Sequence, residues 1–246
     1  MEPFIGKVLS TVVVTVLMFA AANPVWATPV ASVFSGTGWN MFANDDGVGS
    51  GGFVDPGFGG QKFDAEYFFY KIEGSTLSIG LQTGFDVVTG MQTYSGKDYW
   101  AGDIALSFDG SSANYEYAID FGNLTKDYLQ DSLGTHTAGL YSSVTWNNDM
   151  YPGYVAASSP FAMASGTWST AITAVTGNVA DYYYEIATFD VSGIVSGYPY
   201  TLDAHWTMSC GNDNINAHAK VPEPSTLLLL GSGLVGIGLF GRRKKG

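Results

Sequence analysis

Between Tyr115 and Phe121, every second residue is large and apolar, and the residues between them are small or polar. Side chains of a β-strand point alternately to its two faces, so this period of two predicts a strand with one buried face. Turn-forming pairs such as Gly74-Ser75 and Ser95-Gly96 punctuate the chain, and long helical periodicity is absent. We therefore expect an all-β domain, built as an antiparallel β-sandwich or jelly roll. The same alternation recurs at 77–81, 104–108, 182–186 and 202–210.

Two finer expectations follow from the same patterns. In the strand at 202–210 the apolar residues form the inward set, which turns His205 outward. Residues 147–170 contain Pro152, Pro160 and many small residues, and we expect a long loop there.

The N-terminal segment is typical of a secretory signal peptide. Lys7 precedes an apolar run from Val8 to Ala22, and Val25 and Ala27 occupy positions −3 and −1 of a cut after Ala27. We expect residues 1–27 to be removed on export, which leaves the mature domain at 28–220. An uncleaved N-terminal anchor helix is the alternative.

The C-terminal segment, residues 221–246, has three parts in a fixed order. They are the motif Val221, Pro222, Glu223 and Pro224, the apolar run Leu227–Gly241, and the basic cluster Arg242, Arg243, Lys244 and Lys245. With the two residues before it, the apolar run spans roughly 25 Å as a helix, just short of a ~30 Å hydrocarbon core. We expect a short transmembrane helix whose cations remain cytoplasmic as a membrane stop, with the middle of the chain outside.

This order of parts resembles the PEP-CTERM sorting signal of exported bacterial proteins. The resemblance implies an exosortase-type processing enzyme as partner, an inner-membrane intermediate, and delivery to the cell surface or the exopolysaccharide matrix. The signature is also similar to the C-terminal domain of certain ice-binding proteins, which by itself implies no ice binding. A plain C-terminal tail anchor is the alternative to a processed tail.

The charge of residues 28–220 limits the partners of the domain. Five lysines and no arginine stand against twenty acids, sixteen of them Asp, for a net charge of −15. Nucleic acids and anionic lipids are bound through clusters of Lys and Arg, so this balance excludes both as partners. Cys210 is the only cysteine, so an internal disulfide is impossible and stability depends on the hydrophobic core.

Acidic residues near one turn make a candidate Ca²⁺ site, because Ca²⁺ prefers carboxylate and amide oxygens. The EF-hand spacing is missing, and an ordinary polar hairpin is the alternative. The candidate ligands are Asp103, Asp109, Asn114 and Glu116, with Asp120 nearby.

Aromatic residues in or near loops are candidates for stacking on sugar rings, although aromatic rings also fill sandwich cores. The order of strand-like segments resembles the sandwiches of DOMON-like domains and family-nine carbohydrate-binding modules, a resemblance that identifies no ligand. The four principal stacking candidates are Tyr99, Trp100, Trp146 and Trp168, with Tyr94, Tyr151 and Tyr154 as further ones.

Catalytic signatures are missing from residues 28–220. There is no Gly-x-Ser-x-Gly, no His-Glu-x-x-His and no phosphate loop, and the three histidines match no common zinc spacing. Three functions remain open. The leading hypothesis is a non-enzymatic surface or matrix protein, its rival is a carbohydrate-binding module of the matrix, and the third is a secreted hydrolase.

Overall fold

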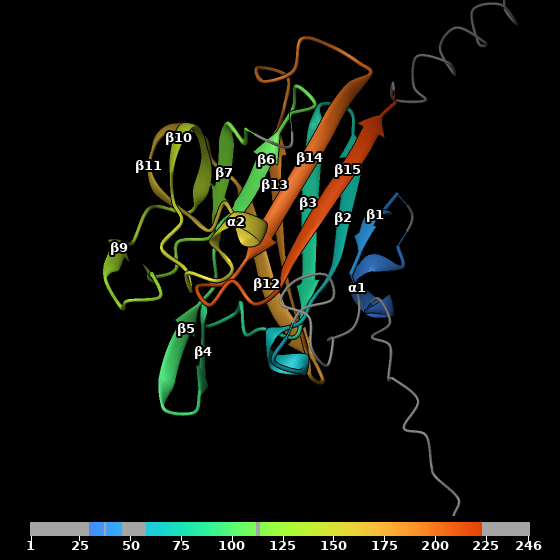
Figure 1. The fold of residues 1–246 in the computed structure, drawn as a ribbon. Coiled ribbons are helices and arrows are strands. Elements are labelled where there is room, and N and C mark those ends of the chain that lie inside the picture. Colours follow the sequence, from blue (N-terminus) through green and yellow to red (C-terminus); the bar gives the residue numbers. More distant parts are fainter. Residues whose placement is uncertain (1–29, 37, 46–57, 112–113, 223–246) are drawn as a thin grey trace, which may run out of the picture.

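The computed structural model describes residues 30–36, 38–45, 58–111 and 114–222, and antiparallel strands dominate them (Figure 1). The first sheet has five strands in the order β1-β2-β3-β13-β12, and the second has six in the order β11-β10-β7-β6-β14-β15. Every strand pairing is antiparallel. The all-β prediction is confirmed. The expected signal peptide and transmembrane helix lie outside the described residues.

The bounds of the elements are as follows. The first sheet contains β1 (Asn40–Asn44), β2 (Ala65–Glu73), β3 (Thr76–Thr83), β12 (Thr173–Val179) and β13 (Tyr182–Asp190). The second contains β6 (Ile104–Ser107), β7 (Tyr117–Asp120), β10 (Gly139–Asn147), β11 (Ala162–Thr170), β14 (Tyr200–Thr207) and β15 (Asn214–Val221). Two hairpins, β4 (Met91–Tyr94) with β5 (Lys97–Trp100) and β8 (Thr125–Lys126) with β9 (Ser132–Gly134), lie apart from the sheets. The helices are α1 (Ala31–Phe34), η1 (Gln61–Phe63) and α2 (Val155–Ser158).

One hydrophobic core joins the two large sheets. Phe68 and Leu81 from the first sheet pack in the same cluster as Ile119 and Trp206 from the second. All four side chains are fully buried or nearly so. Removing such side chains from water is the main favourable contribution to folding, at about 25 cal/mol per Å² of apolar surface. The two sheets therefore stabilise each other face to face.

His205 points away from the core, as the alternation predicted, but it is buried rather than exposed to solvent. Its Nδ1 lies 2.8 Å from Asn216 Oδ1, and its Nε2 lies 3.1 Å from the Ser158 carbonyl oxygen. The reason is that the segment around α2 packs over the outer face of β14 (Figure 1). At His205 the second sheet is thus covered on its outer face as well, and a period of two cannot predict that second cover.

Residues 147–170 also differ from the expected long loop. The segment contains α2, and from Ala162 onward it forms β11, which pairs with β10. Most side chains of β11 are exposed because this strand lies at the edge of the second sheet. A small, polar edge strand lacks the apolar alternation by which strands are recognised.

Three buried carboxylic acids lie where the two sheets face each other. Glu185 on β13, Asp103 before β6 and Asp120 at the end of β7 line one cavity with about 10 Å³ of free volume. That volume accommodates about one water molecule. Glu185 Oε1 makes no hydrogen bond with any described residue. The cavity is therefore lined by Glu185, whose Oε1 has no hydrogen-bond partner, and by two aspartates that have partners.

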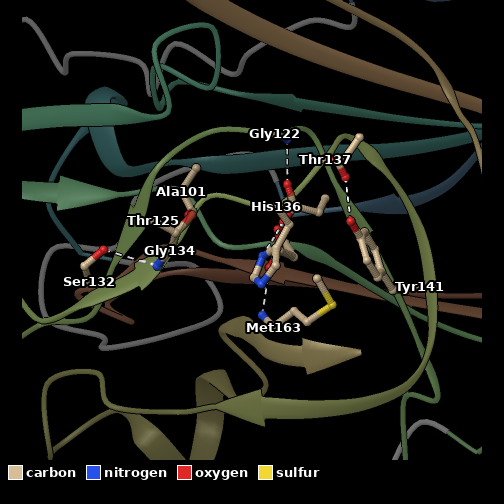
Figure 2. Close-up of polar contacts among 11 residues, drawn as sticks. Ala101, Gly122, Thr125, Ser132, Gly134, His136, Thr137, Tyr141 and Met163 are labelled. Carbon is tan, nitrogen blue, oxygen red and sulfur yellow. Dashed lines mark hydrogen bonds and ion pairs between the residues drawn. The ribbon is translucent and has the colours of Figure 1, made fainter. Parts of the chain in front are cut away.

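The two aspartates on the second sheet do have partners (Figure 2). Asp103 Oδ2 accepts a hydrogen bond from the Met163 amide at 2.7 Å. Asp120 Oδ1 accepts one from the Gly122 amide at 2.6 Å, and its Oδ2 lies 3.0 Å from His136 Nδ1. Burial, and secondarily these two carboxylates, raises the pKa of Glu185 well above its usual value.

We expect Glu185→Gln to change how stability depends on pH. The folded-state pKa of Glu185 is raised, so protonated Glu185 stabilises the fold. This contribution to the free energy of unfolding is complete below the unfolded pKa of about 4.3 and is lost as pH rises through the folded-state pKa. Within that window each proton changes the free energy of unfolding by about 1.4 kcal/mol per pH unit. Urea unfolding between pH 4 and pH 9 should show a shallower loss of stability in Glu185→Gln than in wild type.

Asp181→Asn is the control, since Asp181 is an exposed acid at the turn before the same strand. Its pH profile should match that of wild type. If Glu185→Gln changed the free energy of unfolding by the same amount at every pH, the raised folded-state pKa of Glu185 would be contradicted.

Candidate functional site

An open hollow of about 570 Å³ is lined mainly by aromatic rings. Its lining residues are Phe58, Gly59, Gly60, Phe63, Tyr94, Tyr99, Tyr128, Tyr151, Tyr154, Cys210 and Asn212. Seven of these eleven are aromatic, and none carries a formal charge at neutral pH. The hollow falls within the size range of small-ligand sites, which are typically 300–1,000 Å³.

Several segments that are distant in the sequence build this aromatic hollow. The β4–β5 hairpin contributes Tyr94 and Tyr99, and the turn between β14 and β15 contributes Cys210 and Asn212. The remaining rings come from the approach to η1, the loop after β8 and the loop before α2. The hollow thus lies on loops and a hairpin that the two sheets hold in place.

A glycine permits the approach to η1 to pass close to the β14–β15 turn. A Cβ on Gly59, whose φ is +131°, would lie 2.8 Å from Asn212 Nδ2 and 3.1 Å from Phe63 Cβ. The Phe58 amide donates to the Asn212 carbonyl oxygen at 2.9 Å, and Asn212 Nδ2 donates back to the Phe58 carbonyl oxygen. These contacts fix one wall of the hollow.

The lining rings contact each other mostly edge to face. Phe63 meets Tyr94 at 5.6 Å and 86° and Tyr99 at 5.4 Å and 90°, measured between ring centroids and planes. Tyr151 lies 5.5 Å from Tyr128 and 5.0 Å from Tyr154. Such contacts contribute about 0.5–1.5 kcal/mol each beyond area burial. They hold the rings in fixed orientations before any ligand arrives.

The exposed parts of the lining offer ring faces and neutral hydroxyl groups. Tyr94 and Tyr151 are 55% and 44% exposed. Burial raises the pKa of Tyr99 and of Tyr154, so both hydroxyls remain protonated at neutral pH. The Cys210 thiol, whose pKa burial raises to about 12, donates to Asn212 Oδ1 at 2.7 Å. A thiol in that state is a poor nucleophile.

The structure brings only one of the four principal stacking candidates into the hollow. Tyr99 lines it, as do the further candidates Tyr94, Tyr151 and Tyr154. Trp100 is buried beneath Lys126, whose Nζ is 5.2 Å from its ring centroid. Trp146 is half-buried and donates from Nε1 to the Tyr115 carbonyl oxygen at 2.9 Å. Trp168 is exposed on the edge strand β11.

Three lining aromatics were missed from the sequence, namely Phe58, Phe63 and Tyr128. Phe58 stands directly before Gly59-Gly60, and a bulky ring beside two glycines is the local signal that points to a close approach. Tyr128 follows β8, a two-residue strand without a pattern of its own.

The candidate Ca²⁺ ligands fall at two different places. Asp103 lies before β6 and Asp109 after it, so the strand separates them. Asp109 and Glu116 line a second hollow of about 400 Å³ near the β6–β7 turn. There Asp109 Oδ1 accepts from Ser107 Oγ and the Ser111 amide, while Glu116 Oε1 accepts from the Phe108 amide. The Asn114 amide donates to the Ser111 carbonyl oxygen within the same turn.

Within the described ranges, no three His, Cys, Asp or Glu side chains are grouped so that they can hold a metal ion. The helices in these ranges are also all too short or too polar to cross a bilayer. The expected membrane helix at 227–241 and the basic cluster after it lie beyond the last described residue, Pro222.

The start of the sorting motif is part of the fold. Val221 is the last residue of β15, pairs with Tyr200 of β14 and is completely buried. Pro222 follows directly. The folded domain and the C-terminal motif therefore meet without an intervening linker.

One comparison with known proteins found a match, and that match covers only the tail. Residues 220–244 match the family model described as the PEP-CTERM protein-sorting motif. No curated protein and no solved structure matched the chain. The resemblance drawn from the Pro-Glu-Pro motif, the apolar run and the basic residues is confirmed. The chain carries a PEP-CTERM sorting motif at residues 220–244, a motif that implies export and sorting by exosortase.

Proposed function

We propose that the domain is a non-enzymatic, carbohydrate-binding surface domain that attaches to the extracellular polysaccharide matrix through the aromatic hollow. The observation that carries this proposal is the lining of seven aromatic residues around about 570 Å³. Apolar C–H faces of sugar rings stack on aromatic faces, while tyrosine hydroxyls and an amide are partners for sugar hydroxyls. Asn212 supplies that amide.

The chemistry of the lining favours binding over hydrolysis. A glycosidase uses two carboxyl groups that flank the scissile bond, about 5–9.5 Å apart. Carboxylates and histidines are absent from the described lining of the hollow. The buried acids Asp103, Asp120 and Glu185 line a separate cavity, which is too small for a sugar ring.

The two ends of the chain supply the route to the matrix. We propose that residues 1–27 act as a cleaved signal peptide and that the tail holds the chain in the inner membrane until it is processed. Release from the membrane then places the domain at the cell surface or in the matrix. The acidic domain, with a net charge of −15, remains soluble there.

Removing two exposed rings from the hollow should weaken polysaccharide binding. We expect Tyr94→Ala and Tyr151→Ala each to lower affinity about tenfold, or roughly 1.4 kcal/mol, through loss of a stacking face. Isothermal titration calorimetry against glycans selected on an array gives the dissociation constants. Because both side chains are about half exposed, the melting temperature should change little.

Trp168→Ala is the matched control, because Trp168 is equally exposed at 46% but lies on β11, away from the hollow. Its affinity should equal that of wild type. An equal loss of binding in the control would contradict a site at the hollow, and failure of any glycan on the array to bind would reject the proposed function.

Glu223→Ala should block processing while leaving membrane insertion intact. Glu223 lies outside the apolar run, so its replacement leaves that run unchanged. Cell fractionation and mass spectrometry should find the variant uncut in the membrane fraction. Release of Glu223→Ala with the same new C-terminus as wild type would mean that processing does not require Glu223 of the motif.

A further inference from the structure

We propose that the aromatic hollow selects acidic saccharides, with Lys97 binding the carboxylate of a uronic acid residue. This inference rests on the proposed carbohydrate-binding function and names the class of sugar. It starts from the position of one cation among the lining rings.

Lys97 is held against the wall of the hollow. Its Nζ lies 3.1 Å from the ring centroid of Tyr128 and 5.6 Å from that of Tyr99, and both of these tyrosines line the hollow. The Ser95-Gly96 turn, with φ values of +51° and +79°, directly precedes Lys97, the first residue of β5. The ammonium group is thus fixed beside the lining without being part of it.

The ammonium group has no carboxylate partner. Of the ion pairs among described residues, Lys71 with Glu73 is the only one that involves a lysine. The neighbouring Asp98 points to the opposite face of the hairpin, as alternation requires, and accepts a hydrogen bond from Thr93 Oγ1 at 2.6 Å. A half-buried Lys97 therefore retains hydrogen-bond donors for an external anion.

The distribution of lysines supports an anionic ligand. Only five lysines occur in residues 28–220, against twenty acids. Two of the five lie on elements that line the hollow, Lys62 in η1 and Lys97 in β5, and Lys126 in β8 stands two residues before the lining residue Tyr128. Lys126 Nζ lies over Trp100, the residue after Tyr99. The Lys97 ammonium group lies 3.1 Å from the Tyr128 ring, well inside the ~8 Å screening length of physiological salt, so this cation acts locally despite the net charge of the domain.

The two features of the site together define the ligand. Aromatic faces stack on neutral and on acidic sugar rings alike. A fixed ammonium group beside them favours a ring that carries a carboxylate. A neutral sugar would leave Lys97 without an anionic partner. A uronic acid residue satisfies both the rings and the cation.

The test compares sugars that differ only in charge. Oligogalacturonate and oligomannuronate are each titrated against their own methyl esters, using the full-length chain in detergent at 0.15 M salt. Wild type should bind each acid at least tenfold more tightly than its ester. Lys97→Gln should lose this preference and bind the esters as wild type does. Melting curves check that the variant is folded.

Lys220→Gln is the matched control, since Lys220 lies on β15 and does not line the hollow. It should retain the full preference for the acids. An equal loss in Lys220→Gln would overturn the inference, because attraction would then be nonspecific.

Two further results separate the inference from the proposed function. If acids and esters bind equally and Tyr94→Ala still weakens both, the charge preference is overturned while carbohydrate binding stands. If neither the acids nor the esters bind and the glycan array is also empty, both are overturned.

Discussion

Trp206 lies at the contact on which the rest of the structure depends. Its side chain is completely buried, its ring lies 6.1 Å from that of Phe85, and its Nε1 donates to the Gly102 carbonyl oxygen at 3.1 Å. A Cβ on Gly102 would lie 2.2 Å from the Phe161 carbonyl oxygen, so only glycine fits there. This indole joins β14 to the segment between β5 and β6, and with it the hairpin that carries two rings of the aromatic hollow.

The separation of core and hollow has a physical reason. Most of the core consists of side chains that regular strands direct inward, and only Phe63 and Cys210 of the core cluster also line the hollow. The hollow consists of side chains from turns, a hairpin and loops at the ends of those strands. Such a division lets a binding surface vary while the scaffold remains intact. With one cysteine and no disulfide, the scaffold relies on apolar burial, strand pairing and buried hydrogen bonds such as that of Trp206.

The sequence predicted those features that depend on local order. The alternation in segments such as 77–81 predicted strands, and the C-terminal motif with its apolar and basic parts predicted the sorting tail. Contacts between distant segments could not be predicted in this way. Nothing local to Tyr99 indicates that Phe63 lies against it, and nothing around His205 indicates the cover that α2 provides. Asp103 and Asp109 are close in sequence, yet a strand places them at separate sites.

The burial of Val221 places a geometric limit on the enzyme that processes the tail. Only Pro222 separates the end of β15 from Glu223, and two residues of extended chain reach about 7 Å at most. A peptidase cleft that engages this motif must therefore operate almost in contact with the folded end of β15. A deep cleft that encloses several residues on each side of the bond would have to peel β15 from β14 first. The fold thus favours a shallow cleft.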